Sequence, residues 1–140
     1  MTVSGRYARI VEHGIVLQDF AGIKDPGESM RAIAEAREFM ETLPKGQQLV
    51  MTDARAAVFN TEIARAMHDL ADHHTPWVIG SVVIGLTPIM RLAFRAIVTA
   101  TGRDIKALDS RTAAIAYLLA RRRKRFNALA SEAAVSPQKP

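Results

Sequence analysis

The passage over residues 77–102 constrains the fold most, because a strand-like run leads directly into a helix. Its first part contains VIGSVVIGL, an apolar and β-branched stretch that is typical of a central strand. Thr87 then supplies an N-cap, Pro88 suits the first helical position, and Gly102 suits the position after the helix. A buried strand followed at once by a helix predicts an α/β fold.

The rest of the chain alternates between short apolar runs and amphipathic segments. At its start, residues 7–11 and 15–20 flank His13-Gly14, which predicts a β-hairpin. Further strands are expected at 48–53, 77–86 and 104–109, and helices at 28–43, 61–74, 88–101 and from 111 onward. This order predicts an α/β domain whose sheet is mixed and mainly parallel, with an N-terminal hairpin and about four helices.

Size and composition agree with one domain. The chain has 140 residues, of which 49% are hydrophobic and 24% charged, as in an ordinary globular protein. We expect the domain over residues 1–125 and a disordered tail over 126–140. The sequence has no cysteine, which excludes disulfides, a thiolate nucleophile and cysteine-ligated metals. The first residues lack the apolar stretch of a secretory signal, so we expect a cytoplasmic location.

Positive charge is concentrated in one run, Arg121, Arg122, Arg123, Lys124 and Arg125. The formal net charge is +5, and the other 14 basic residues balance the 14 acidic ones. Such a run can contact an anionic lipid surface or nucleic acid. A solvated helix end is favoured here, because cations suit the negative C-terminal pole of a helix. We do not expect nucleic acid as a partner.

Two stretches resemble a known family: LVMTDARAAVF, and TPWVIGSVVIGLTPIMRLAFRAIVTATGRDIKALDSRTAAIAYLLA. They are similar to the SpoIIAA-like, or STAS-like, bacterial proteins. In that family a strand ends in Thr-Asp, a Phe follows in the loop, and a strand ending in Gly-Leu-Thr leads into an apolar helix closed by Gly-Arg. The matching residues are Thr52, Asp53, Phe59, Gly85, Leu86, Thr87, Gly102 and Arg103. The resemblance covers roughly residues 7–120.

The resemblance implies binding rather than catalysis. STAS domains bind protein partners, nucleotides or lipids, and many are switched by phosphorylation of a Ser that directly follows the strand's final Asp. Ala54 occupies that place here, so the usual phospho-Ser switch is not expected unless Thr52 or Thr61 substitutes. The SpoIIAA-like branch is also similar to CRAL-TRIO lipid carriers, which implies an apolar ligand or reversible association with a membrane.

The helix over 88–101 is apolar around most of its circumference. At 100° per residue, one arc comprises Ile89, Leu92, Ala93, Ala96 and Ala100, which we expect to pack on the sheet. A second arc comprises Met90, Phe94 and Val98, separated by a polar stripe with Arg91 and Arg95. The second arc can be covered by the protein's own helices, by a second copy, or by lipid. The predicted partner or ligand surface is therefore Thr52, Asp53, Phe59, Met90, Arg91, Phe94, Arg95 and Val98.

No complete catalytic constellation is present in the sequence. Asp53 ends a strand where α/β proteins place ligand-binding groups, but it has no recognisable base or nucleophile beside it. His68 and Asp72 have a spacing compatible with metal ligation, yet no third ligand is identifiable. We therefore expect no enzymatic activity, cofactor or metal. Two hypotheses remain: a homodimeric module that binds a protein partner, and a small carrier of an apolar ligand that associates reversibly with membrane.

Overall fold

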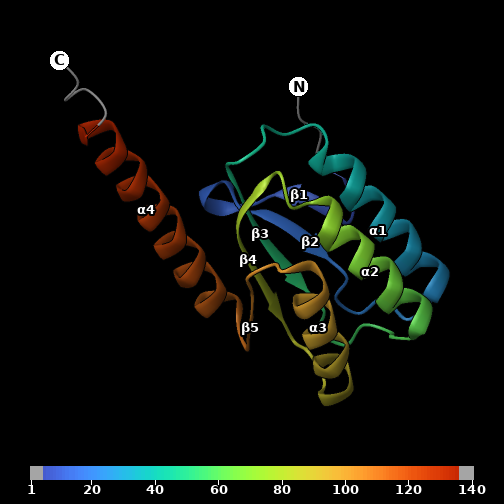
Figure 1. Ribbon diagram of the computed structural model, residues 1–140. Coiled ribbons are helices and arrows are strands. Elements are labelled where there is room, and N and C mark those ends of the chain that lie inside the picture. The colour runs from blue at the N-terminus through green and yellow to red at the C-terminus, as the bar shows by residue number, and fades with distance from the viewer. Residues whose placement is uncertain (1–4, 136–140) are drawn as a thin grey trace.

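The structure is a computed structural model that describes residues 5–135 (Figure 1). Five strands form one sheet: β1 (Ala8–Ile10), β2 (Val16–Asp19), β3 (Gln48–Asp53), β4 (Val78–Ile84) and β5 (Ile105–Leu108). The α-helices are α1 (Pro26–Met40), α2 (Thr61–His73), α3 (Pro88–Thr101) and α4 (Arg111–Val135), and a short 3-10 helix spans Glu12–Gly14. The predicted α/β order with an N-terminal hairpin is confirmed.

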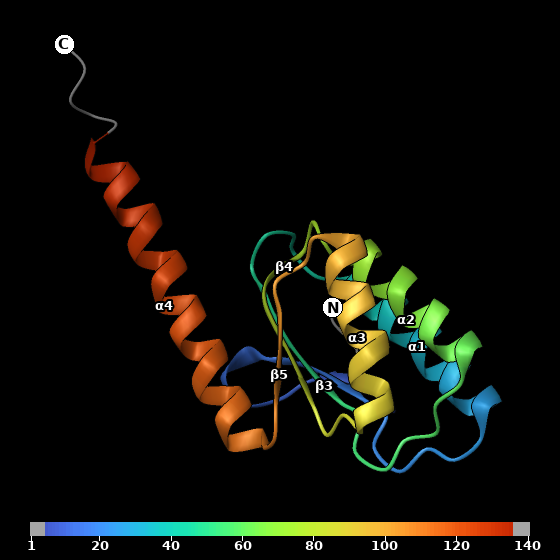
Figure 2. The same cartoon turned by 60° about the horizontal axis from the view of Figure 1, so that its bottom comes forward.

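The strands lie side by side in sequence order, β1-β2-β3-β4-β5. β1 pairs antiparallel with β2, and every other neighbouring pair is parallel. Crossovers between adjacent parallel strands are right-handed, so connections that always step in one direction put their helices on one face. This explains why α1, α2 and α3 lie together on one side of the sheet; α4, which follows the last strand and is not part of a crossover, lies on the other (Figure 2).

Local sequence signals set the helix starts. α1 begins at Pro26, two residues before the predicted start, because Asp25 is its N-cap and its carboxylate accepts a 2.9 Å hydrogen bond from the backbone N–H of Glu28. Asn60 caps α2 in the same way through the N–H of Ile63, at 2.7 Å.

Strand alternation divides the core into two parts. The side chains between the sheet and α4 are Ile15, Leu17, Leu49, Met51, Val82, Ile84, Ala114 and Leu118. The opposite face packs against α1 and α2 through Val16, Phe20, Ile33, Phe39, Met40, Val50, Ile63 and Leu70, among others. Two packed layers around a shared sheet are the usual way for such elements to bury their apolar sides.

α3 is packed much less tightly than α1. Met90 is its only buried residue, whereas Ile89 and Leu92 are 67% and 63% exposed. Phe94 and Val98 are half-buried. The expectation that the first arc packs on the sheet is therefore wrong for Ile89, Leu92, Ala96 and Ala100, which are exposed, and only Ala93 of that arc faces inward. Met90 and Phe94 of the second arc also face inward, toward the protein's own sheet and helices. Periodicity reveals two arcs but does not fix the rotation of the helix, which here follows from the connection that joins β4 to α3.

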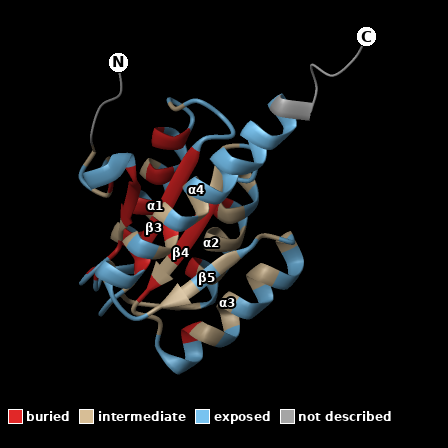
Figure 3. Ribbon diagram, turned by 90° about the vertical axis from the view of Figure 1, so that its left-hand side faces the viewer, coloured by how far each residue is buried: buried red, intermediate tan, exposed pale blue. Residues whose placement is uncertain are grey.

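α4 continues well past the end of the predicted domain. Its last turns reach Val135, so the expectation of a disordered tail is wrong for residues 126–135, and residues 136–140 lie outside the described part. Ala is the best helix former, and it supplies four of the ten residues over 126–135. Residues 123–133 of α4 have exposed side chains, including Phe126 and Leu129, and this part of the helix projects from the body (Figure 3).

Gly85 allows two loops to meet beside the start of α3. Its φ is +83°, and a Cβ built on it would lie 2.8 Å from the backbone N and Cα of Arg55. Both the left-handed conformation and the close backbone approach therefore require glycine. Gly22 also has a positive φ, +73°, but a Cβ there would meet nothing within 4 Å.

These two glycines provide a matched test. We expect Gly22→Ala to lower the free energy of unfolding by about 1–2 kcal/mol, the cost of a left-handed non-glycine residue. Gly85→Ala should cost at least about 2 kcal/mol more, because the loop backbone must also move. Urea denaturation of the two variants measures both values, and equal losses would contradict the close approach at Gly85.

Candidate ligand pocket

A cavity of about 120 Å³ lies between the sheet, α2 and α3. Its walls are mostly apolar, and its polar residues are Gln18, Ser29, Thr52, His74, Ser81 and Arg103. α2 contributes Ile63, Met67 and Leu70, and α3 contributes Met90, Phe94 and Ile97. Within each helix these residues are spaced three or four apart, so they form one stripe along the side that faces the other helix.

The loose packing of α3 leaves this space open. Val83 lies in the middle of β4 and lines the cavity, yet it is only half-buried. Ala93 is the residue of α3 that stands between Met90 and Phe94, and its methyl group fills little of the gap. Close packing is the rule in protein interiors, so a cavity of this size above a central strand is unusual.

The inner end of the cavity is polar and begins with a chain of three buried side chains. The Thr52 hydroxyl donates to Gln18 Oε1 at 2.9 Å, and Gln18 Nε2 lies 3.2 Å from His74 Nδ1. Because that amide nitrogen is a donor, His74 Nδ1 accepts and the ring proton resides on Nε2. His74 Nε2 has no hydrogen-bond partner among the described residues.

His74 is neutral in the folded protein. The residue is only 3% exposed, and its burial lowers the pKa of the imidazole to about 3. Electrostatic interactions with His73 and Arg103 act in the same direction, and the nearby backbone carbonyl of Ala36 has the opposite, smaller effect. Burial disfavours the charged form of a histidine, so this ring takes part in the pocket as a neutral group.

Arg103 reaches the same end of the cavity from the turn after α3. Its guanidinium donates to the carbonyl oxygen of Ala71 at 2.5 Å and to Ser81 Oγ at 2.6 Å. It thereby links the end of α3 to α2 and to β4. Its burial lowers the pKa of Arg103, although the group stays protonated at physiological pH because the usual value is so high.

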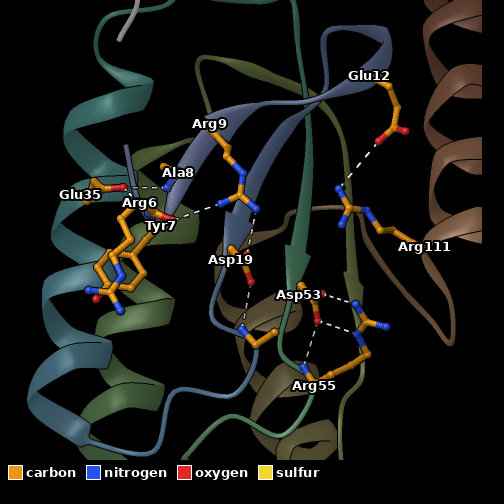
Figure 4. Close-up of polar contacts among 11 residues, drawn as sticks. Arg6, Tyr7, Ala8, Arg9, Glu12, Asp19, Glu35, Asp53, Arg55 and Arg111 are labelled. Atoms are coloured by element: carbon orange, nitrogen blue, oxygen red, sulfur yellow. Dashed lines mark hydrogen bonds and ion pairs between the residues drawn. The ribbon is translucent and has the colours of Figure 1, made fainter. Parts of the chain in front are cut away.

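Asp53 serves a different structural purpose (Figure 4). Its carboxylate accepts hydrogen bonds from Arg55 Nε at 3.0 Å, from the Arg55 terminal nitrogen at 2.6 Å and from the Arg55 backbone N–H at 3.1 Å. Burial raises the pKa of Asp53, but these bonds and the charges of Arg55 and Arg111 outweigh it, and the pKa lies below its usual value. This ion pair shapes the loop that passes Gly85.

The cavity brings together half of the predicted surface. Thr52, Phe59, Met90 and Phe94 line it. The remaining four predicted residues, Asp53, Arg91, Arg95 and Val98, lie outside the lining. Arg91 instead forms an ion pair with Asp109 at 3.5 Å, and Arg95 is exposed.

The basic run lies on α4, away from this cavity. Arg121 forms an ion pair with Asp104 at 3.3 Å and also donates to the carbonyl of Ile79, so it helps to fix α4 beside the sheet. Arg122 is half-buried, and Arg123, Lys124 and Arg125 are exposed. Their role as an anionic contact stays a prediction.

Sequence reasoning missed five polar residues of the cavity: Gln18, Ser29, His74, Ser81 and Arg103. A signal was present for two of them, because Gln18 and Ser81 interrupt otherwise apolar strand sequences. A polar side chain inside a buried strand must find a hydrogen-bonding partner, and it therefore indicates a polar cluster nearby. His74 and Arg103 carry no such signal, since each follows a helix where charge is common.

Residues 5–135 contain neither a cluster of metal ligands nor a membrane-spanning helix. No group of three or more His, Asp or Glu side chains in this range is arranged to hold a metal ion. Among the helices of the same range, none combines the length and the apolar composition needed to cross a membrane.

The chain was also compared with family models, with curated proteins and with solved structures. None of the three comparisons gives a match. The resemblance to STAS-like proteins therefore stays a prediction, and the geometry of the cavity is the basis on which a function can be proposed.

The neutral His74 predicts a specific dependence of stability on pH. The unfolded chain takes up a proton near the ordinary pKa of 6.5, but the folded protein does so only near about 3. As pH falls from 7 to 5, protons therefore favour unfolding, and the free energy of unfolding should fall by about 2 kcal/mol from this residue. Urea denaturation at the two pH values should show this loss in the wild-type protein and not in His74→Gln. His68→Gln, at an exposed position, should retain it; equal losses in all three proteins would contradict the assignment.

Proposed function

We propose that this chain is a non-catalytic protein that binds a small apolar ligand in the cavity between β4, α2 and α3. The observation that carries the proposal is the cavity itself. Its volume, about 120 Å³, approaches that of engineered apolar cavities of about 150 Å³ that take up benzene. A cavity that is empty loses contacts on all its walls, and a ligand of matching shape restores them.

The packing of α3 supports ligand entry. Only Met90 is buried, and the inward residues Phe94 and Ile97 are half-buried. A helix with few buried contacts opens at a small cost in free energy compared with global unfolding. Movement of α3 against α2 would therefore admit a ligand without disturbing the sheet.

The polar end of the cavity supports binding rather than turnover. Ser81 accepts a hydrogen bond from Arg103, and His74 Nδ1 is used by Gln18, so neither is arranged as a nucleophile with its base. An apolar-ligand carrier is the second of the two functions that the resemblance implies. Its location in the cytoplasm and reversible association with membrane stay predictions.

Binding of hexan-1-ol, followed by backbone amide shifts in ¹H–¹⁵N spectra, tests the proposal. Saturable shifts should concentrate on the facing sides of α2 and α3. Ala93→Phe places a ring in the cavity and should weaken binding at least about tenfold, which corresponds to about 1.4 kcal/mol. Ala96→Phe adds the same ring on the exposed side of α3 and should leave binding unchanged. Hexan-1-ol that gives no saturable shifts, or two variants that behave alike, would reject the proposal.

A second candidate function is self-association through the outward side of α3. Ile89 and Leu92 expose most of their surface there, one helical turn apart. Exposed aliphatic side chains gathered on one helix are typical of a contact site. This observation favours the homodimeric interaction module, with its contact on the arc opposite to the one that the sequence predicted.

Two aspartate substitutions on α3 separate an outer contact from the cavity wall. Leu92→Asp should leave the thermal melt unchanged and shift the protein to monomer in sedimentation velocity, because the charge meets water in the monomer. Phe94→Asp should lower the free energy of unfolding by about 2 kcal/mol or more, since it removes a ring from the cavity wall and places a charge there. Leu92→Asp that sediments as the wild-type protein would exclude this contact.

A further inference from the structure

Arg103 is a partly buried cation without a carboxylate. All fourteen acidic side chains lie within the described residues, and the ion pairs that they form involve other basic groups. Burial is the one influence on its pKa, and no neighbouring negative charge offsets it. A buried charge usually has a partner of opposite sign, because leaving water otherwise costs free energy.

Among the described residues, this cation is the only charged group that lines the cavity at neutral pH. The lining contains no Asp, Glu or Lys, and the neighbouring imidazole of His74 is neutral. The other polar side chains of the lining, such as Gln18 and Thr52, are uncharged and bond to one another. An anion entering the cavity would therefore meet a single positive group and no negative one.

Arg103 also has donors to spare, and they are held in place. A guanidinium carries five N–H groups, of which two are used by Ala71 and Ser81. The Ser81 hydroxyl accepts from Arg103, and its own proton has no acceptor among the described residues. The fixed, planar guanidinium and the adjacent hydroxyl suit the two oxygens of a carboxylate.

We propose that the ligand of this cavity is a small amphipathic carboxylate, whose carboxylate binds Arg103 and Ser81 while its apolar part lies between α2 and α3. This inference rests on the proposed function and adds the chemical class of the ligand. It accounts for a charged arginine at the polar end of a cavity whose other walls are mostly apolar. It also assigns Arg103 the role of selecting anionic over neutral ligands.

Hexanoate and hexan-1-ol are a matched pair of probes, because they differ mainly in the charged end. An apolar cavity alone prefers the alcohol, which loses less hydration on entry. With Arg103 in place, hexanoate should bind at least about tenfold more tightly than hexan-1-ol at pH 7. Hexylammonium should bind more weakly than both. Amide shifts in ¹H–¹⁵N spectra give the three dissociation constants.

Substitutions test whether Arg103 causes the preference for hexanoate over hexan-1-ol. Arg103→Gln should reverse it, so that hexan-1-ol binds more tightly than hexanoate, whereas Arg95→Gln removes an exposed arginine of α3 and should change neither affinity. Thermal melts establish that each variant is folded. Ser81→Ala keeps the charge and removes one donor, so it should weaken hexanoate binding more than hexan-1-ol binding; this variant decides the matter if Arg103→Gln does not fold.

The outcomes separate the two proposals. Hexan-1-ol that binds as tightly as hexanoate, or an Arg103→Gln variant that keeps the preference for hexanoate, would overturn the carboxylate inference and leave the apolar-ligand function intact. Failure of both probes to bind the wild-type protein would overturn both. A preference for hexanoate that Arg95→Gln abolishes equally would also overturn the inference, because it would report only general attraction by surface charge.

Discussion

α3 is held at its two ends rather than along its length, and the cavity depends on this constraint. At its start, Gly85 lies against the backbone of Arg55, which Asp53 fixes through three hydrogen bonds. Beyond its end, Arg103 is bound to α2 and β4. A helix fixed in this way can stand away from the sheet without losing its position, and the space beneath it persists because the helix cannot collapse into it.

The buried polar side chains of the cavity are of two kinds. Gln18, Thr52 and His74 satisfy most of one another's hydrogen-bonding groups. Arg103 differs, since its charge has only neutral partners. A network of neutral groups, such as the first, specifies how the surrounding side chains pack. A charge that lacks an opposite charge and lies beside a cavity is physically explained if a ligand binds there.

The sequence predicted what short-range interactions determine. Thr87, Pro88 and Gly102 bound α3 correctly, because caps act on backbone groups within one turn. The rotation of α3 was predicted incorrectly, since it depends on loops that meet from distant parts of the chain. Arg103 could not be recognised as a cavity residue for the same reason: its partners Ala71 and Ser81 lie 32 and 22 residues away. The helical end of α4 was missed because its composition suits both a polar tail and an isolated helix.

α4 is long enough to project beyond the sheet (Figure 3). A helix of 25 residues extends about 38 Å, and Arg121, whose guanidinium donates to the carbonyl of Ile79, lies about 15 Å from its start. The remainder is a rod with a base of arginine and lysine side chains and with Phe126 and Leu129 farther along. The basic residues of α4 lie apart from the cavity. The molecule thus separates the site proposed for a small ligand from the surface that presents positive charge.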